Sequence, residues 1–101
     1  MNIADLYEKY NLMPQLREHQ LRVGGIVKLL SNDRDSVVTA LVHDMGNMAK
    51  FSNLDEHWSK EQQIFWSKYG RDAHEATFAI LKDAGLDRYS KYLIEEGRAY
   101  D

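Results

Sequence analysis

The helical spacing of apolar residues along the chain limits the possible folds more than any other feature. Between the turn signals, apolar side chains recur every three to four residues, as one face of an α-helix requires. No segment alternates apolar and polar residues in the manner of a half-buried strand. The sequence therefore predicts an all-α fold, a compact bundle of about five to six helices.

Capping residues predict where the first three helices begin and end. Asn2 suits the cap of a first helix that ends near Tyr10. Pro14, the only proline, suits the first turn of a second helix that runs to about Leu30. The third helix is expected to end at Gly46, since glycine readily adopts the left-handed conformation just past a helix.

Two capping boxes and two glycines bound the helices that follow. In a capping box, the side-chain oxygen of the residue before the helix accepts a hydrogen bond from the backbone N–H three residues later. The Glu or Gln side chain at that later position accepts a hydrogen bond from the backbone N–H of the first residue. The two pairs are Ser59 with Gln62 and Asp72 with Glu75, and the glycine stops are Gly70 and Gly85. A last helix is expected to begin near Asp87.

Composition favours one soluble domain over residues 1–101. No Pro-rich or Gly/Ser-rich linker interrupts the 101 residues, and no internal repeat is visible. The chain lacks a leader pattern and any apolar run near the ~20 residues that a membrane span needs, so we expect a cytoplasmic protein without a membrane partner. A net charge of −3 without blocks of like charge argues against a nucleic-acid surface. Homo-oligomerisation is left open.

The absence of cysteine restricts the chemistry. It excludes disulfides, thiolate metal sites and a cysteine nucleophile, so a metal site must use histidine and carboxylate ligands. The segment ALVHDMGNMAK is the strongest candidate, because His43 and Asp44 end a helix that is apolar on all sides. An unpaired buried carboxylate is costly, so Asp44 should be paired, hydrogen-bonded or bound to a metal.

A third ligand comes from the core-facing side of the second helix. His19 falls on the apolar stripe of Leu16, Val23, Val27 and Leu30. Taken alone, a histidine there is more often a hydrogen-bonded core residue than a ligand. Together with His43 and Asp44, His19 would complete a set of two nitrogen ligands and one oxygen ligand for a divalent metal ion. The remaining coordination positions would be open for water.

The other two histidines carry weaker signals. His57 stands among polar residues and is expected to be a solvated loop residue. His74 lies in the first turn of its helix, where it could pack at the edge of the core, bind a second metal ion or touch a phosphate near the helix start.

These residues, in this order and helical context, resemble the HD-domain superfamily of metal-dependent phosphohydrolases. The resemblance covers roughly residues 14–86, with His19 in LREHQLRVGGIVKLL, the His-Asp pair in VVTALVHDMGN and His74 in HEATFAIL. It implies that His19, His43 and Asp44 bind metal, and that Asp44 bridges if two ions bind. The resemblance also implies that His74 binds a second metal ion or contacts the substrate phosphate.

The chain departs from the family pattern at two places. The family often has lysine four residues after the paired histidine, where this chain has Asn47, so Lys50 would have to reach in. The family also takes its last ligand from an aspartate on a late helix, and Asp101 is the only late candidate. We expect that the chain is a shortened member of the family that lacks this ligand. The alternative is that Asp101, the final residue, binds the metal as an unusual terminal ligand.

The expected activity is hydrolysis of a phosphomonoester or phosphodiester, of a nucleotide or related small molecule, by metal-activated water that Asp44 orients. Sequence does not distinguish Mn, Mg, Fe, Zn, Ni and Co. The cations that could neutralise the phosphate are Arg17, Arg22, Lys50 and Arg71, with Lys50 and Arg22 preferred and a solvated surface role the alternative for each. An iron-dependent oxygenase on the same fold and a non-catalytic metal-binding or interaction module stay open.

Overall fold

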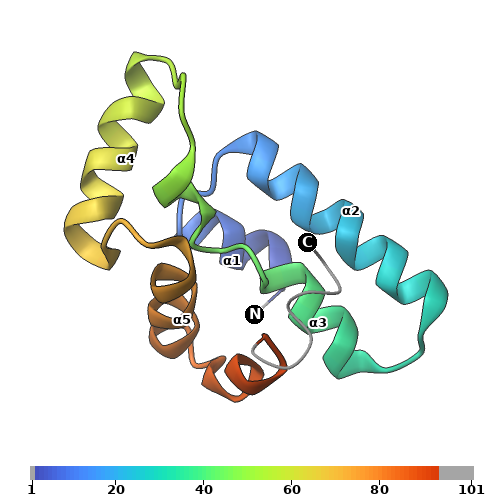
Figure 1. Ribbon diagram of the computed structural model, residues 1–101. Coiled ribbons are helices and arrows are strands. Elements are labelled where there is room, and N and C mark those ends of the chain that lie inside the picture. The colour runs from blue at the N-terminus through green and yellow to red at the C-terminus, as the bar shows by residue number, and fades with distance from the viewer. Residues whose placement is uncertain (1, 94–101) are drawn as a thin grey trace.

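The computed structural model describes residues 2–93, and every regular element in that range is helical (Figure 1). The elements are α1 (Ile3–Lys9), α2 (Pro14–Leu30), α3 (Arg34–Val42), the 3₁₀ turn η1 (Asn47–Lys50), α4 (Glu56–Tyr69), α5 (Ala73–Asp83) and the 3₁₀ turn η2 (Asp87–Tyr89). Five complete α-helices, two 3₁₀ turns and a further helical segment at residues 90–93 confirm, over the described residues, the predicted all-α bundle. None of these helices is long and apolar enough to cross a membrane.

The α2–α3 hairpin supports the site described below. The two helices run side by side in Figure 1, with Gly24 of α2 facing Leu41 of α3. A Cβ at Gly24 would lie 2.4 Å from Leu41 Cδ2, so a larger residue would have to displace the Leu41 side chain. From α1, Tyr7 donates its hydroxyl to the Leu41 carbonyl at 2.5 Å. The end of α3 is thus packed between α1 and α2.

The hydrophobic core lies where α1, the start of α2, the end of α3 and α5 meet. Its fully buried side chains include aromatic, thioether and branched groups, namely Tyr7, Leu12, Met13, Leu16, Val42, Met45, Ile80 and Leu81. The second half of α2 leaves this core, and Leu30 is 83 % exposed. The expected apolar stripe of α2 therefore does not reach its last residue.

Three helix boundaries match the capping residues that predict them. The Asn2 side chain accepts from the Asp5 backbone N–H at 2.8 Å, and α2 spans Pro14 to Leu30 as expected. Asp72 accepts from the Glu75 N–H at 2.9 Å at the start of α5. The glycine stops, Gly70 at φ 91° and Gly85 at φ 77°, both adopt the left-handed region that glycine favours.

The start of α4 is a correction. The helix begins at Glu56, because the Asp55 side chain accepts from the Trp58 N–H at 2.9 Å and caps it earlier than Ser59 could. Ser59 instead donates to the Leu54 carbonyl at 3.2 Å. The buried Gln62 amide donates to the carbonyls of η1 and the following linker, so neither member of the predicted capping box caps a helix.

The end of α3 is a second correction. The helix stops at Val42, and residues 43–46 form turns that lead into η1. Gly46 has φ −89° and ψ 0°, so it is not in the left-handed conformation expected of it. Glycine is required here by the close approach of α5.

Candidate metal centre

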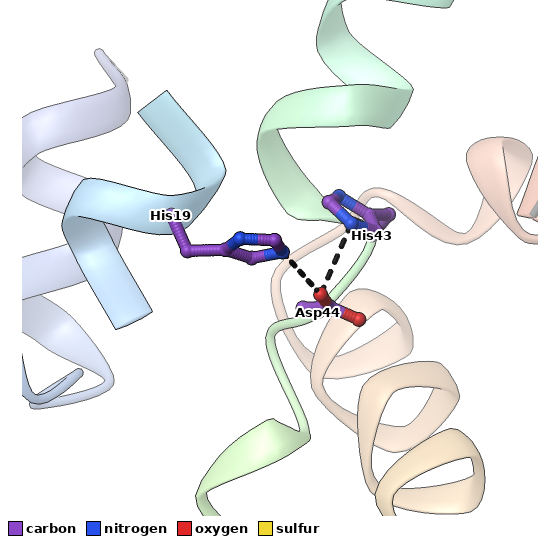
Figure 2. Close-up of side chains that lie close together, drawn as sticks. All are labelled: His19, His43 and Asp44. Atoms are coloured by element: carbon purple, nitrogen blue, oxygen red, sulfur yellow. Dashed lines mark hydrogen bonds and ion pairs between the residues drawn. The ribbon is translucent and has the colours of Figure 1, made fainter. Parts of the chain in front are cut away.

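His19, His43 and Asp44 converge at one point between α2 and the turn after α3 (Figure 2). Asp44 Oδ2 lies 2.9 Å from His19 Nε2 and 3.0 Å from His43 Nε2. Among the described residues, these three form the group whose potential metal-ligand atoms all lie within 4.8 Å of one another. The spatial convergence that the sequence predicts is therefore observed.

The two separations between Asp44 and the histidines are compatible with ligation of a shared metal ion. Two ligand atoms at about 2.1 Å from an ion, at right angles to each other, are roughly 3 Å apart. The two Asp44–histidine separations, 2.9 and 3.0 Å, match that value. The rings of His19 and His43 are tilted at 51° with centroids 5.5 Å apart, so both can point nitrogens at one place.

His43 is oriented by the backbone of α3, the helix that ends just before it. Its Nδ1 lies 2.5 Å from the Ala40 carbonyl oxygen, which accepts an N–H from that nitrogen. A neutral ring with its proton on Nδ1 carries a lone pair on Nε2, directed here at the Asp44 carboxylate. Two electron-rich atoms at 3.0 Å repel each other unless a proton or a metal cation lies between them. A metal-binding histidine usually makes the same kind of contact from its other ring nitrogen to a carbonyl.

The site is enclosed on one side and open on the other. The His43 side chain is 2 % exposed and that of Asp44 is 11 % exposed, whereas that of His19 is 44 % exposed. A small ligand could therefore approach from the side of α2. The buried carboxylate and imidazole are shielded from bulk water, which strengthens their electrostatic interactions.

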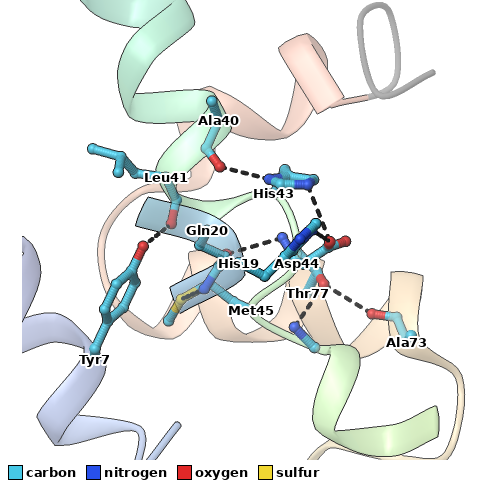
Figure 3. Close-up of polar contacts among 11 residues, drawn as sticks. Tyr7, His19, Gln20, Ala40, Leu41, His43, Asp44, Met45, Ala73 and Thr77 are labelled. Atoms are coloured by element: carbon cyan, nitrogen blue, oxygen red, sulfur yellow. Dashed lines mark hydrogen bonds and ion pairs between the residues drawn. The ribbon is translucent and has the colours of Figure 1, made fainter. Parts of the chain in front are cut away.

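Two side chains from other helices hold the turn that carries the ligands (Figure 3). From α2, Gln20 accepts the Asp44 backbone N–H on its Oε1 at 3.0 Å. From α5, the Thr77 hydroxyl accepts the Gly46 N–H at 2.8 Å and donates to the Ala73 carbonyl at 2.9 Å. A Cβ on Gly46 would lie 2.2 Å from the Ala73 oxygen, so only glycine lets α5 approach this closely.

The pKa of Asp44 reflects two opposing effects. Burial of the carboxyl group raises its pKa, but hydrogen bonding and charge from His43, and then from His19, lower it by more. The net pKa of Asp44 lies below the usual aspartate value. The carboxylate therefore stays ionised at neutral pH despite its burial, as a metal ligand must.

This lowered pKa predicts a loss of stability in acid. A carboxyl group whose pKa is lower in the folded state stabilises the fold above its unfolded pKa of about 4, and that contribution is lost as pH falls through the folded value. In urea unfolding of metal-free protein, the difference in free energy between wild type and Asp44→Asn should be present at about pH 5 and shrink as the pH falls below about 4. A difference that stays constant down to about pH 2 would contradict the assignment.

Loss of the Thr77 hydroxyl should destabilise the fold through the ligand-bearing turn. Thr77→Val leaves the buried Gly46 N–H without its acceptor, which should cost about 1–3 kcal/mol in urea unfolding. Thr39→Val is the matched control, since the buried Thr39 hydroxyl only donates to the Asp35 carbonyl, which α3 already uses. It should cost less than about 1 kcal/mol. Equal losses in the two variants would show that Thr77 has no special role.

The remaining predicted site residues lie outside this group. His74 is exposed in the first turn of α5, and Lys50 is exposed at the end of η1. Arg22 is exposed and pairs with Glu18 at 2.5 Å. Asp101 lies outside the described residues. The structure therefore brings together three of the four proposed metal ligands and leaves His74 at the surface.

The other charged and aromatic candidates have contacts of their own. Arg17 donates from Nε to the Leu12 carbonyl at 2.6 Å, and Arg71 stacks over the Trp66 ring at 4.4 Å. His57 is exposed as expected, but it stands in the first turn of α4 rather than in a loop, edge-on to the Trp58 ring at 4.9 Å.

Gln20 and Thr77 were not identified from the sequence as part of the site. For Gln20, the available signal was its position on α2, four residues after Leu16. Leu16, Gln20 and Gly24 form the buried face of that helix. Thr77 lies on the buried side of α5, among apolar residues, and the sequence gives no sign that its hydroxyl contacts another segment.

No protein-family model, curated protein or solved structure matches this chain.

Proposed function

We propose that the protein is an HD-type metal-dependent phosphohydrolase that cleaves a small phosphomonoester or phosphodiester. The observation that carries this proposal is the convergence of His19, His43 and Asp44 on one point that is open on the α2 side. Two imidazoles and one carboxylate are a common donor set of catalytic metal sites, in which water or substrate takes the open position. The order and helical setting of these residues, which resemble the HD-domain superfamily, add support.

His19, His43 and Asp44 would bind the ion, and each has a definable part. A divalent ion at this site would lower the pKa of a coordinated water toward neutrality and polarise a phosphoryl oxygen of the substrate. His43 is held in place through the Ala40 carbonyl. Asp44 directs Oδ2 at the imidazoles, and its second oxygen can accept a hydrogen bond from the attacking water and orient it (Figure 2).

Three exposed cationic or titratable side chains are proposed for the substrate phosphate. Lys50 ends η1, which follows the ligand-bearing turn, and His74 stands in the first turn of α5, which contacts that turn through Thr77. Arg22 stands on α2, one turn beyond His19, and would have to exchange its pairing with Glu18 for the phosphate. Such an exchange is inexpensive because exposed ion pairs contribute little. His74 could alternatively bind a second ion.

The donor set also favours a second candidate function. Two histidines and one carboxylate with open positions are the ligands of non-haem iron oxygenases. Asn47, in the place where the HD family often has lysine, favours a third, a metal-binding or interaction module without catalysis. Each of these three functions predicts a different result in one experiment.

That experiment measures phosphate release and oxygen uptake by the purified protein loaded with Mn²⁺, Co²⁺, Ni²⁺, Zn²⁺, Mg²⁺ or Fe²⁺. With a panel of aryl and nucleoside phosphate esters, we expect metal-dependent phosphate release that falls by at least about 100-fold in Asp44→Ala. His57→Ala, which removes an exposed histidine of α4, should leave the rate unchanged. Iron-dependent oxygen uptake without phosphate release would favour the oxygenase, and metal binding without either would favour the module.

A further inference from the structure

Gln20 is the buried polar residue closest in sequence to a proposed ligand, and it contacts the ligand-bearing turn (Figure 3). Its side chain is fully buried on α2. Its Oε1 accepts the Asp44 backbone N–H at 3.0 Å, and its Nε2 donates to Met45 Sδ, a weak acceptor, at 3.7 Å. A buried amide is costly unless its polar groups are paired, and both ends of this one are paired to adjacent residues of the same turn.

Helix α2 therefore contacts Asp44 at two places through two consecutive residues. His19 contacts the carboxylate at 2.9 Å, and Gln20 contacts the backbone N–H of the same residue at 3.0 Å. Because His19 and Gln20 share one rigid helix, the Gln20 contact sets the distance between the Asp44 backbone and the His19 backbone. The half-exposed His19 ring alone could not fix this distance, since an exposed imidazole is free to change rotamer.

We propose that Gln20 is a positioning residue of the metal centre, which holds Asp44 at coordinating distance from His19 before any ion binds. This inference rests on the proposed function, because it assumes that these residues bind metal. Supporting groups of this kind orient the ligands of metal sites, and their loss typically weakens metal binding by about 10- to 100-fold. A site arranged in advance also spends less of its binding free energy on ordering the ligands.

The chain offers a matched control in Gln62. This second buried glutamine also ties backbone together, since its Nε2 donates to the carbonyls of Met48 and Phe51 at 2.8 and 2.7 Å. Through these bonds it holds η1 and the linker to α4, not the turn at residues 43–46. Gln62→Leu and Gln20→Leu should therefore both lower stability, but only Gln20→Leu should alter the metal centre.

The test is a Co²⁺ titration of the full chain against a competing chelator, with the cobalt absorption spectrum recorded for each variant. Gln20→Leu should bind Co²⁺ about 10- to 100-fold more weakly than wild type and with an altered spectrum. Gln62→Leu should match wild type in both. If Gln20→Leu does not fold, Gln20→Met supplies the comparison, because its thioether is a weak acceptor.

Amide hydrogen exchange at Asp44 in metal-free protein provides an independent readout. The Asp44 N–H should be protected in wild type and should exchange faster in Gln20→Leu. Wild-type cobalt affinity in Gln20→Leu, or an equal loss in Gln62→Leu, would overturn the role of Gln20 while leaving the metal centre intact. Wild-type protein that binds no cobalt would overturn the metal centre itself and, with it, this inference.

Discussion

Replacing Asp44 by alanine is expected to abolish specific metal binding. The change removes the only anionic ligand of the group and leaves two imidazoles. Loss of a supporting group already weakens metal sites by about 10- to 100-fold, so loss of the carboxylate itself should weaken Co²⁺ binding by more than that. In a chelator-competition titration, wild type should bind one Co²⁺ per chain and Asp44→Ala should bind none at the same free concentration.

Thermal or urea unfolding of the same samples gives a second measure of this effect. At a free Co²⁺ concentration about 100 times its dissociation constant, binding should raise the free energy of unfolding of wild type by about 2.7 kcal/mol. Asp44→Ala should gain nothing, while His57→Ala should gain as much as wild type. Equal stabilisation of wild type and Asp44→Ala by cobalt would place the ion elsewhere.

Among alanine substitutions at the described glycines, Gly46→Ala is expected to cause the largest loss of stability. The new Cβ would lie 2.2 Å from the Ala73 carbonyl oxygen and 2.4 Å from the Thr77 backbone nitrogen. Both are backbone atoms of α5, so no side-chain rotation can relieve the overlap, and the turn that carries His43 and Asp44 must move. Overpacking of this kind costs about 1–3 kcal/mol and sometimes more, and we expect about 3 kcal/mol or above in urea unfolding.

Gly25→Ala is the matched control for this prediction. A Cβ at Gly25 meets no atom within 4 Å, and Gly25 lies inside α2. Alanine there should therefore stabilise the protein by about 0.5–1 kcal/mol, since glycine is a poor helix former. The two glycine substitutions should thus have opposite signs. A Gly46→Ala protein as stable as wild type would show that α5 does not approach the turn this closely.

The fold and the ligand triad could be predicted because both depend on local patterns. Asn2, Pro14 and Asp72 mark helix starts through contacts within three residues or through a fixed φ angle, which sequence displays directly. The apolar stripe through His19 and the cost of burying a carboxylate predict the convergence of His19 with the His43-Asp44 pair. The stripe itself is a correction, because the buried face of α2 is formed by Leu16, Gln20 and Gly24, and the His19 side chain is 44 % exposed.

The parts that could not be predicted depend on contacts between distant segments. The sequence predicts that Gly46 ends a helix, but glycine is required there because the backbone of α5, more than 25 residues further along the chain, leaves no space for a Cβ. Gln62 matched a capping box, yet its amide pairs with carbonyls of the preceding linker. The surface position of His74 depends on how α5 is rotated against the turn, and the sequence pattern around it fits either orientation.

An anomalous difference map from a crystal grown with Co²⁺ or Mn²⁺ tests the central claim most directly. The account predicts one strong peak at about 2.0–2.2 Å from a ring nitrogen of His19, a ring nitrogen of His43 and a carboxylate oxygen of Asp44. The remaining coordination positions should hold water. A map with no peak at this point, or with the ion bound only by exposed residues such as His57 or His74, would contradict the assignment of a metal centre.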